Sequence, residues 1–361
     1  MPQVPTRVRA FDWLRGIAVL VMVETHALVF LRPDLRMGVF AARLNFINGL
    51  VAPSFIFAAG FSLALVQVRT ALAPASGSSR ALRVRKTVRR VAEVLGVGLL
   101  VNYIWFPIRH DPVWLLRLDI LPCIAVCLFL ALPLMVLLAA QPRALAVVLF
   151  LLAAAAFGVA PLFEHVTGPW ANVVNRSGSL KPVFPLLPWA GYVFLGGAVG
   201  AVAARETLHI LQGVMVGLGA VGLLLFELVP FFQRIYPPHE YAVSDPGNHG
   251  HRLLFVAALL LLLLVVEERV PGAWRSSRPI RFIELFGTTS LAAYFFHEEL
   301  LFFQLFGHSL ARHFRDACGW GGYGALLLLV WTLTALLVQA TNALYPRWDD
   351  FLRRRMEPKK A

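Results

Sequence analysis

Charged side chains are scarce in this sequence. Only 15% of its 361 residues are Asp, Glu, Lys or Arg, whereas 58% are hydrophobic and the mean hydropathy is +0.70. A soluble domain of this size needs a much more polar surface, so the composition excludes that class of protein. The sequence predicts an all-α fold instead, a polytopic bundle of membrane-spanning helices.

Cysteine is also rare. The three cysteines are Cys123, Cys127 and Cys318, and none of them has the spacing to histidines that a metal site requires. Two lie in an apolar run, where a free cysteine behaves as a small hydrophobic residue. We therefore expect neither a disulfide framework nor a bound metal.

Acidic residues are the third group in short supply, with 20 Asp and Glu against 33 Lys and Arg, a net charge of +13. Such an excess can indicate a nucleic-acid partner. The basic residues, however, lie in short segments between apolar runs, where they set membrane topology and contact anionic lipid headgroups. The expected partner is membrane lipid, with no nucleic acid.

Ten apolar runs are long enough to cross a bilayer. They lie near residues 12–31, 47–68, 88–107, 119–138, 143–162, 184–203, 208–229, 252–267, 283–306 and 323–345. The connecting segments alternate between basic ones and ones of mixed charge, and the basic segments all fall on one side. Both termini are therefore predicted to be cytoplasmic, in a multi-pass protein of the cell inner membrane.

Nothing in the sequence indicates a second domain. No internal repeat is visible, so residues 1–361 are read as one transmembrane domain with a basic cytoplasmic tail from about residue 346. The longest outer connection contains the sequence RIYPPHEYAVSDPGNHGHR, which is rich in turn formers and titratable groups. Such a loop is either a functional lid or a plain solvated connection.

The run from Arg7 to Leu31 carries polar groups that lipid should exclude. Among them are Asp12, Arg15 and His26. Eleven helical steps bring His26 back to the face of Arg15, roughly 16 Å along the axis, and Asp12 is close enough in sequence to pair with Arg15. An arginine held in this way suits a phosphate or carboxylate, although a single arginine here usually only reaches the headgroups.

His26 is the strongest candidate for chemistry. A histidine in a helix is most often a satisfied core residue, but an ionisable group deep in an apolar run normally faces a cavity or a partner. Neutral imidazole can take a proton from a hydroxyl or amine, as acyl transfer requires, or it can carry the acyl group itself. The sequence leaves both roles open.

A second polar cluster interrupts the ninth run, SLAAYFFHEELLF. It contains His297, Glu298 and Glu299. The simple interpretation places these residues at the membrane interface. If this run extends outward, however, His297 lies on the side toward which His26 points. Two histidines and a carboxylate can then converge, with the carboxylate fixing an imidazole tautomer.

A basic loop, Arg80–Arg90, is predicted between the second and third runs. Its candidate ligands for the phosphates of a cytoplasmic nucleotide cofactor are Arg83, Arg85, Lys86, Arg89 and Arg90. A signal for membrane orientation, together with lipid contact, explains most such clusters equally well.

Several segments together resemble membrane acyltransferases that modify sugars. DWLRGIAVLVMVETH is similar to the opening signature of bacterial sugar O-acyltransferases, in which an arginine, ten residues and a histidine follow one another, here Arg15 and His26. Four further segments resemble the branch named for heparan-α-glucosaminide N-acetyltransferase: GLVAPSFIFAAGFSLAL, LRLDILPCIAV, FPLLPWAGYVFLGG and FGTTSLAAYFFHEELL. They occur in the order of that family and extend over most of the chain.

The resemblance implies an acyl-coenzyme A donor, with acetyl-CoA favoured, that enters from the cytoplasm, and a sugar or glycolipid acceptor on the far side. It implies a catalytic histidine near a central cavity. In the eukaryotic members that histidine belongs to the first outer loop, whereas the segment 32–48 contains none. Either His26 takes its place, as in the bacterial O-acyltransferases, or the N-acetyltransferase chemistry does not carry over.

The leading hypothesis is thus an acyl-CoA-dependent acyltransferase acting on a glycan hydroxyl or amine. Arg15, held by Asp12, would order the donor or the inner mouth of the cavity. His26 would act as general base or transient acyl carrier, and His297 with Glu298 would help to position or protonate the acceptor side. The alternative is a transporter, since buried charges also mark substrate pathways. The absence of an inverted repeat weighs against it. A scaffold without chemistry leaves the Arg15 and His26 pair unexplained. Acceptor identity, N- or O-transfer and a homo-oligomeric state stay open.

Overall fold

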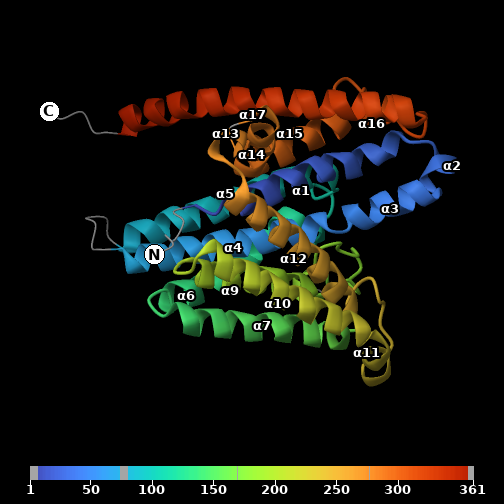
Figure 1. Cartoon of the computed structure of the whole chain (residues 1–361). Coiled ribbons are helices and arrows are strands. Elements are labelled where there is room, and N and C mark those ends of the chain that lie inside the picture. Colours follow the sequence, from blue (N-terminus) through green and yellow to red (C-terminus); the bar gives the residue numbers. More distant parts are fainter. Residues whose placement is uncertain (1–6, 74–79, 169, 276, 357–361) are drawn as a thin grey trace. The chain divides into compact units, whose positions relative to one another are not determined.

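The regular structure is helical throughout the part of the chain that the computed structural model describes, residues 7–73, 80–168, 170–275 and 277–356 (Figure 1). Apart from the helices, these residues form only two isolated β-bridges. Helices satisfy all their interior backbone hydrogen bonds within one segment, which the lipid interior demands. The predicted all-α fold is confirmed.

The helices group into two compact units. The first comprises residues 1–14 and 52–272, and the second comprises residues 15–51 and 273–361. Helices of the first unit are α4 (Val51–Leu72), α5 (Arg80–Trp105), η2 (Pro112–Leu116), α6 (Ile120–Leu137), α7 (Pro142–Phe163), α8 (Ala171–Val174), α9 (Leu186–Ala203), α10 (Leu208–Glu227), α11 (Val229–Ile235) and α12 (Pro246–Arg269). Helices of the second unit are η1 (Leu28–Phe30), α2 (Pro33–Arg36), α3 (Val39–Asn48), α13 (Gly272–Arg275), α14 (Arg278–Thr288), α15 (Ser290–Phe302), α16 (Leu310–Phe314) and α17 (Trp320–Met356), together with most of α1 (Arg9–Ala27).

Eight segments are long and apolar enough to cross a membrane within the described ranges. They are Arg9–Phe30, Val39–Leu72, Ile120–Leu137, Pro142–Phe163, Leu186–Ala203, Leu208–Glu227, Pro246–Arg269 and Trp320–Leu344. The chain is therefore a multi-pass membrane protein, with eight of the ten predicted spans supported.

The third and ninth predicted spans are the two that the described residues do not support as single membrane-crossing helices. The third is the helix α5, but it begins at Arg80 and carries Arg89, Arg90 and Glu93 in the stretch that would cross the membrane. The ninth is not one helix: α14 ends at Thr288 and α15 begins at Ser290. Threonine hydroxyl groups that bond to backbone carbonyls compete with the regular helical pattern, and those of Thr288 and Thr289 both bond to Leu285 O.

Small residues allow the main helices of the first unit to pack closely. In this unit α7 lies along α9, and α10 lies along α12 (Figure 1). Between α4 and α9 the backbones touch, because a Cβ atom added to Gly196 would meet the carbonyl oxygen of Phe57, and one added to Gly60 would meet that of Val193. The glycine-rich FPLLPWAGYVFLGG segment thus serves close helix contact, as such stripes usually do in membranes.

The C-terminal helix is longer than its predicted span. α17 continues through residue 356, so the basic segment expected as a tail from about residue 346 is helical over 346–356. Free thiols are found for all three cysteines, and Cys123 Sγ lies 4.0 Å from Cys127 Sγ, one helical turn away in α6.

Candidate functional site

Arg15 and His26 lie on one uninterrupted helix, α1, which spans Arg9–Ala27. The eleven helical steps from one to the other correspond to roughly 16 Å of helix, so the two side chains are too far apart to touch. Both are partly exposed. Both residues lie on one helix, as predicted, and at this separation Arg15 cannot contact His26. The role of Arg15 stays a prediction.

Residues far apart in sequence hold the His26 end of α1 in place. Gly16 admits the backbone of Ile283 in α14, since a Cβ atom added to Gly16 would collide with the Ile283 carbonyl. Trp331 of α17 donates from its indole nitrogen to the carbonyl of Leu20 at 3.0 Å. The Tyr323 hydroxyl donates to Glu24 Oε1 at 2.6 Å. Helices α14 and α17 therefore hold α1 between Gly16 and Glu24.

His26 meets His297 and Glu298 of α15 in the second unit. His26 Nδ1 lies 2.8 Å from Glu298 Oε1 and 2.9 Å from His297 Nε2, and the two imidazole rings stack with centroids 5.1 Å apart. His297 is 0% exposed and Glu298 11%, whereas the His26 side chain is 33% exposed. The two histidines and the carboxylate converge, and His26 is the member that solvent or substrate can reach.

The hydrogen bonds of this cluster fix where its protons sit. His297 Nδ1 lies 2.9 Å from the backbone carbonyl of Ala293, which only accepts, so Nδ1 carries the hydrogen. In a neutral ring, Nε2 of His297 is then an acceptor. His26 Nδ1 faces that acceptor and the Glu298 carboxylate, so its hydrogen points at both. The lone pair of a neutral His26 is left on Nε2.

Asp12 belongs to the first unit, where it is buried and bonds to Arg7 Nε at 2.6 Å. Near it, the amides of Arg9 and Ala10 donate to the two carboxylate oxygens of Glu267 at 2.9 and 2.8 Å. The start of α1 is thus tied to the end of α12, an arrangement that the sequence did not predict. Pairing of Asp12 with Arg15 stays a prediction.

The predicted phosphate ligands lie on the first turns of α5, not in a loop. Arg85, Lys86, Arg89 and Arg90 are exposed, and Arg89 also forms a salt bridge with Glu93 at 2.9 Å. The side chain of Arg83 lies outside the described residues. Arginine, leucine and lysine are good helix formers, so a basic stretch of this composition need not be a loop.

A cavity of about 240 Å³ opens beside these basic turns. It is lined by Val84 of α5, by Gln67 and Thr70 near the end of α4, and by residues at the end of α6. Gln67 Nε2 also donates to Thr87 Oγ1 at 3.1 Å, which connects α4 to the basic stretch. The first unit thus has a hollow next to a row of exposed cations.

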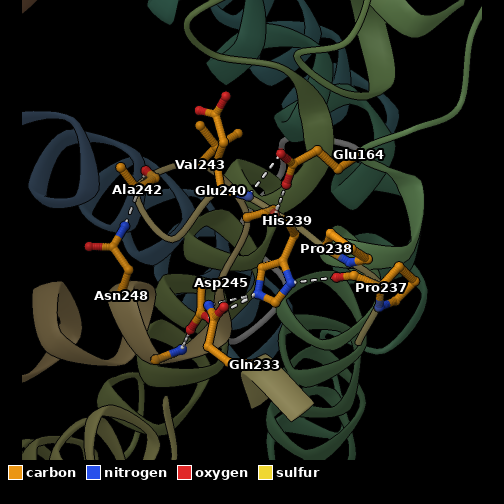
Figure 2. Close-up of polar contacts among 12 residues, drawn as sticks. Glu164, Gln233, Pro237, Pro238, His239, Glu240, Ala242, Val243, Asp245 and Asn248 are labelled. Carbon is orange, nitrogen blue, oxygen red and sulfur yellow. Dashed lines mark hydrogen bonds and ion pairs between the residues drawn. The ribbon is translucent and has the colours of Figure 1, made fainter. Parts of the chain in front are cut away.

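The long connection before α12 forms a second polar cluster (Figure 2). His239 lies between two acceptors, with Nδ1 2.8 Å from the Pro237 carbonyl and Nε2 2.8 Å from Asp245 Oδ2. Asp245 also accepts from Gln233 Nε2 and caps α12 by accepting from the Gly247 amide, both at 2.7 Å. The side chains of His239 and Asp245 are 1% and 0% exposed.

This connection is fastened to the one that follows α7. Glu164 accepts from the Glu240 amide at 3.0 Å (Figure 2) and from the Ser244 hydroxyl. His165 contacts the Pro238 carbonyl. Burial, and secondly the Asp245 carboxylate, raise the pKa of Tyr236 above its ordinary value. Because the titratable side chains bind one another, the arrangement favours a rigid connection over a mobile lid.

Comparison with protein families identifies the chain. Residues 7–223 match the family model of the heparan-α-glucosaminide N-acetyltransferase catalytic domain. The chain belongs to this family. No curated protein matches the sequence significantly.

Membership of the heparan-α-glucosaminide N-acetyltransferase family makes the chain a membrane acetyltransferase, and this family uses acetyl-CoA. An enzyme is thus favoured over the transporter considered from the sequence. The matched region contains Arg15 and His26 and ends before His297 and Glu298.

Proposed function

We propose that this protein transfers an acetyl group from cytoplasmic acetyl-CoA to a hydroxyl or amine of a glycan or glycolipid on the opposite side of the cell inner membrane, with both termini in the cytoplasm. The single observation that carries the proposal is the contact of His26 Nδ1 with Glu298 and His297, in a chain of the heparan-α-glucosaminide N-acetyltransferase family.

His26 is proposed as the general base. Its Nδ1 hydrogen is held by Glu298, so Nε2 offers the lone pair that removes a proton from the attacking hydroxyl or amine. Glu298 then stabilises the imidazolium, as the carboxylate of a histidine and carboxylate pair does in acyl transfer. His297 supports the same tautomer through its acceptor nitrogen. It acts on His26 and not directly on the acceptor, which refines its expected role.

Donor binding is proposed for the start of α5. Arg85, Lys86, Arg89 and Arg90 are exposed cations beside the cavity at Val84, and guanidinium and ammonium groups bind nucleotide phosphates through charge-assisted hydrogen bonds. Arg15, which is polar within a membrane-length helix, is proposed to order the donor. The reaction needs no metal, because an imidazole base and a thioester suffice for it.

Calorimetry with acetyl-CoA tests the donor assignment. The purified full chain in detergent should bind acetyl-CoA saturably, and Arg15→Ala should weaken that binding. A panel of amino sugars, neutral sugars and lipid-linked glycans then identifies the acceptor by the release of free coenzyme A. Failure of the folded protein to bind acetyl-, propionyl- or longer acyl-CoA would contradict the proposal and revive the transporter alternative.

Acyl transfer through His26 itself is a second route that the same geometry allows, since Nε2 can attack the thioester directly. Rapid quenching after mixing with radiolabelled acetyl-CoA, in the absence of acceptor, separates the two routes. Label retained on wild-type protein and lost in His26→Gln indicates a covalent intermediate. No label, with turnover intact, indicates direct transfer.

A further inference from the structure

We propose that His26, His297 and Glu298 also form a Zn²⁺ site, and that Zn²⁺ bound there inhibits the enzyme reversibly. Metal binding follows from the geometry alone, whereas the inhibition rests on the proposed role of His26 as base. The donor atoms are His26 Nδ1, His297 Nε2 and a Glu298 carboxylate oxygen, which all lie within 4.8 Å of one another.

The spacing of these atoms suits a tetrahedral ion. Their separations are 2.8 Å between His26 and Glu298, 2.9 Å between the two histidines and 3.7 Å between His297 and Glu298. Zinc binds nitrogen and oxygen ligands at about 2.0–2.2 Å, which places neighbouring tetrahedral ligands about 3.3 Å apart. The observed values lie on both sides of this distance, so only small side-chain shifts are needed.

An independent feature of the site resembles a metal-ligating histidine. The ring nitrogen of His297 that faces away from the cluster bonds to the Ala293 carbonyl at 2.9 Å. Histidine ligands nearly always donate their other N–H in this way, and the bond fixes the tautomer whose Nε2 is free for a metal. The buried pair of His297 and Glu298 is thus oriented toward the place where the ion would lie.

Access and selectivity also follow from the described residues. His26 is the exposed member of the three, so an ion can enter from its side and keep a water molecule in the fourth position. Two imidazoles and one carboxylate favour Zn²⁺ and neighbouring transition metals, whereas Mg²⁺ prefers oxygen ligands. Magnesium should therefore not compete.

Inhibition follows from a change of tautomer. When Zn²⁺ takes the lone pair of His26 Nδ1, the hydrogen leaves Nδ1 and the neutral ring carries it on Nε2 instead. The proton passes through solvent from one ring nitrogen to the other, so none is released overall. Nε2 then has no lone pair with which to accept a proton from the acceptor.

Titration of the chelator-stripped full chain with ZnCl₂ by calorimetry tests the binding site. His297→Gln should lower the affinity at least tenfold. A matched control is H308A/H313A, because His308 Nδ1 and His313 Nε2 form an exposed pair 2.8 Å apart in the same unit. This control should keep the tight site. Wild-type affinity in His297→Gln, or loss of tight binding in H308A/H313A, would overturn the proposal, and MgCl₂ should give no saturable signal.

If His297→Gln fails to fold, Glu298→Gln supplies the same test, and acetyl-CoA binding verifies that each variant is folded. Acetyl transfer by wild-type protein should fall with increasing free Zn²⁺ and return when chelator is added. Transfer unaffected at concentrations that fill the site would refute the inhibitory role. Zinc binding without any transfer activity would instead refute the proposed function while leaving the metal site intact.

Discussion

Replacement of Glu298 by glutamine removes one charge from the cluster and little else. Glutamine has nearly the same shape and can still accept a hydrogen bond from His26 Nδ1, which lies 2.8 Å from the carboxylate. What is lost is the attraction between a carboxylate and the imidazolium that His26 becomes as it takes the acceptor proton. That attraction is strongest in the transition state, so its loss should lower kcat.

The size of the effect can be worked out from the contact. A hydrogen bond that involves a charged group contributes about 1.5–3 kcal/mol. With Glu298 only 11% exposed, solvent screens this pair weakly. If the whole contribution is gained in the transition state, kcat should fall roughly 10- to 150-fold. The KM for acetyl-CoA should change little, since Glu298 is not among the proposed donor ligands.

Initial rates of coenzyme A release, measured at several acetyl-CoA concentrations, separate kcat from KM. Glu299→Gln is the matched control, because Oε1 of Glu299 is buried and has no hydrogen-bond partner among the residues described. Equal kcat values for Glu298→Gln and wild type would refute the reasoning. Equal losses in both glutamine variants would do so as well, since they would indicate a general effect of charge on α15.

Three further predictions concern other parts of the chain. Gly196→Ala should destabilise the fold by about 1–3 kcal/mol, because its methyl group meets the Phe57 carbonyl, and a lower Tm than wild type in detergent checks this. Asp245→Asn should cost about 1.5–3 kcal/mol, because it weakens the buried charge-assisted hydrogen bonds that the carboxylate makes with His239 and Gln233, and no loss of Tm would contradict the described cluster. The double variant R85A/K86A should raise the KM for acetyl-CoA at least tenfold and leave kcat unchanged. A tenfold change is roughly what the loss of one charge-assisted hydrogen bond costs. An unaltered KM would place the donor elsewhere.

Local periodicity explains why α1 could be predicted. A polar residue repeated after eleven positions in an apolar run defines one helix face without any tertiary information, and Arg15 and His26 lie on such a helix. The meeting of His26 with His297 depends on packing between segments 271 residues apart in sequence. The sequence could predict this contact only on the assumption that the ninth apolar run extends outward across the membrane.

Other features follow from competition between local effects. The apolar run over 283–306 looks continuous, yet the hydroxyl groups of two adjacent threonines bond to backbone carbonyls where α14 gives way to α15. The basic segment Arg80–Arg90 was predicted as a loop between two apolar runs, although arginine and lysine favour helix, and it forms the start of α5. In both cases the prediction followed hydropathy alone. The hydrogen bonds of the threonine side chains and the helix propensity of the basic residues decide the local structure instead.

The connection before α12 shows a third feature that could not be predicted from the sequence. Its histidines and acids were noticed in the sequence, but composition cannot distinguish side chains that bind a ligand from side chains that bind one another. The burial of His239 and Asp245 against each other favours the second interpretation. Their spacing of six residues, without regular secondary structure between them, gives no periodic signal.

The measurement that tests the central claim most directly is acetyl transfer by His26→Gln, with His308→Gln as the exposed histidine control from the same unit. The account predicts that His26→Gln remains folded and binds acetyl-CoA as wild type does, while its transfer rate falls by a factor of roughly 10² to 10⁴. Transfer at the wild-type rate by folded His26→Gln would contradict the account.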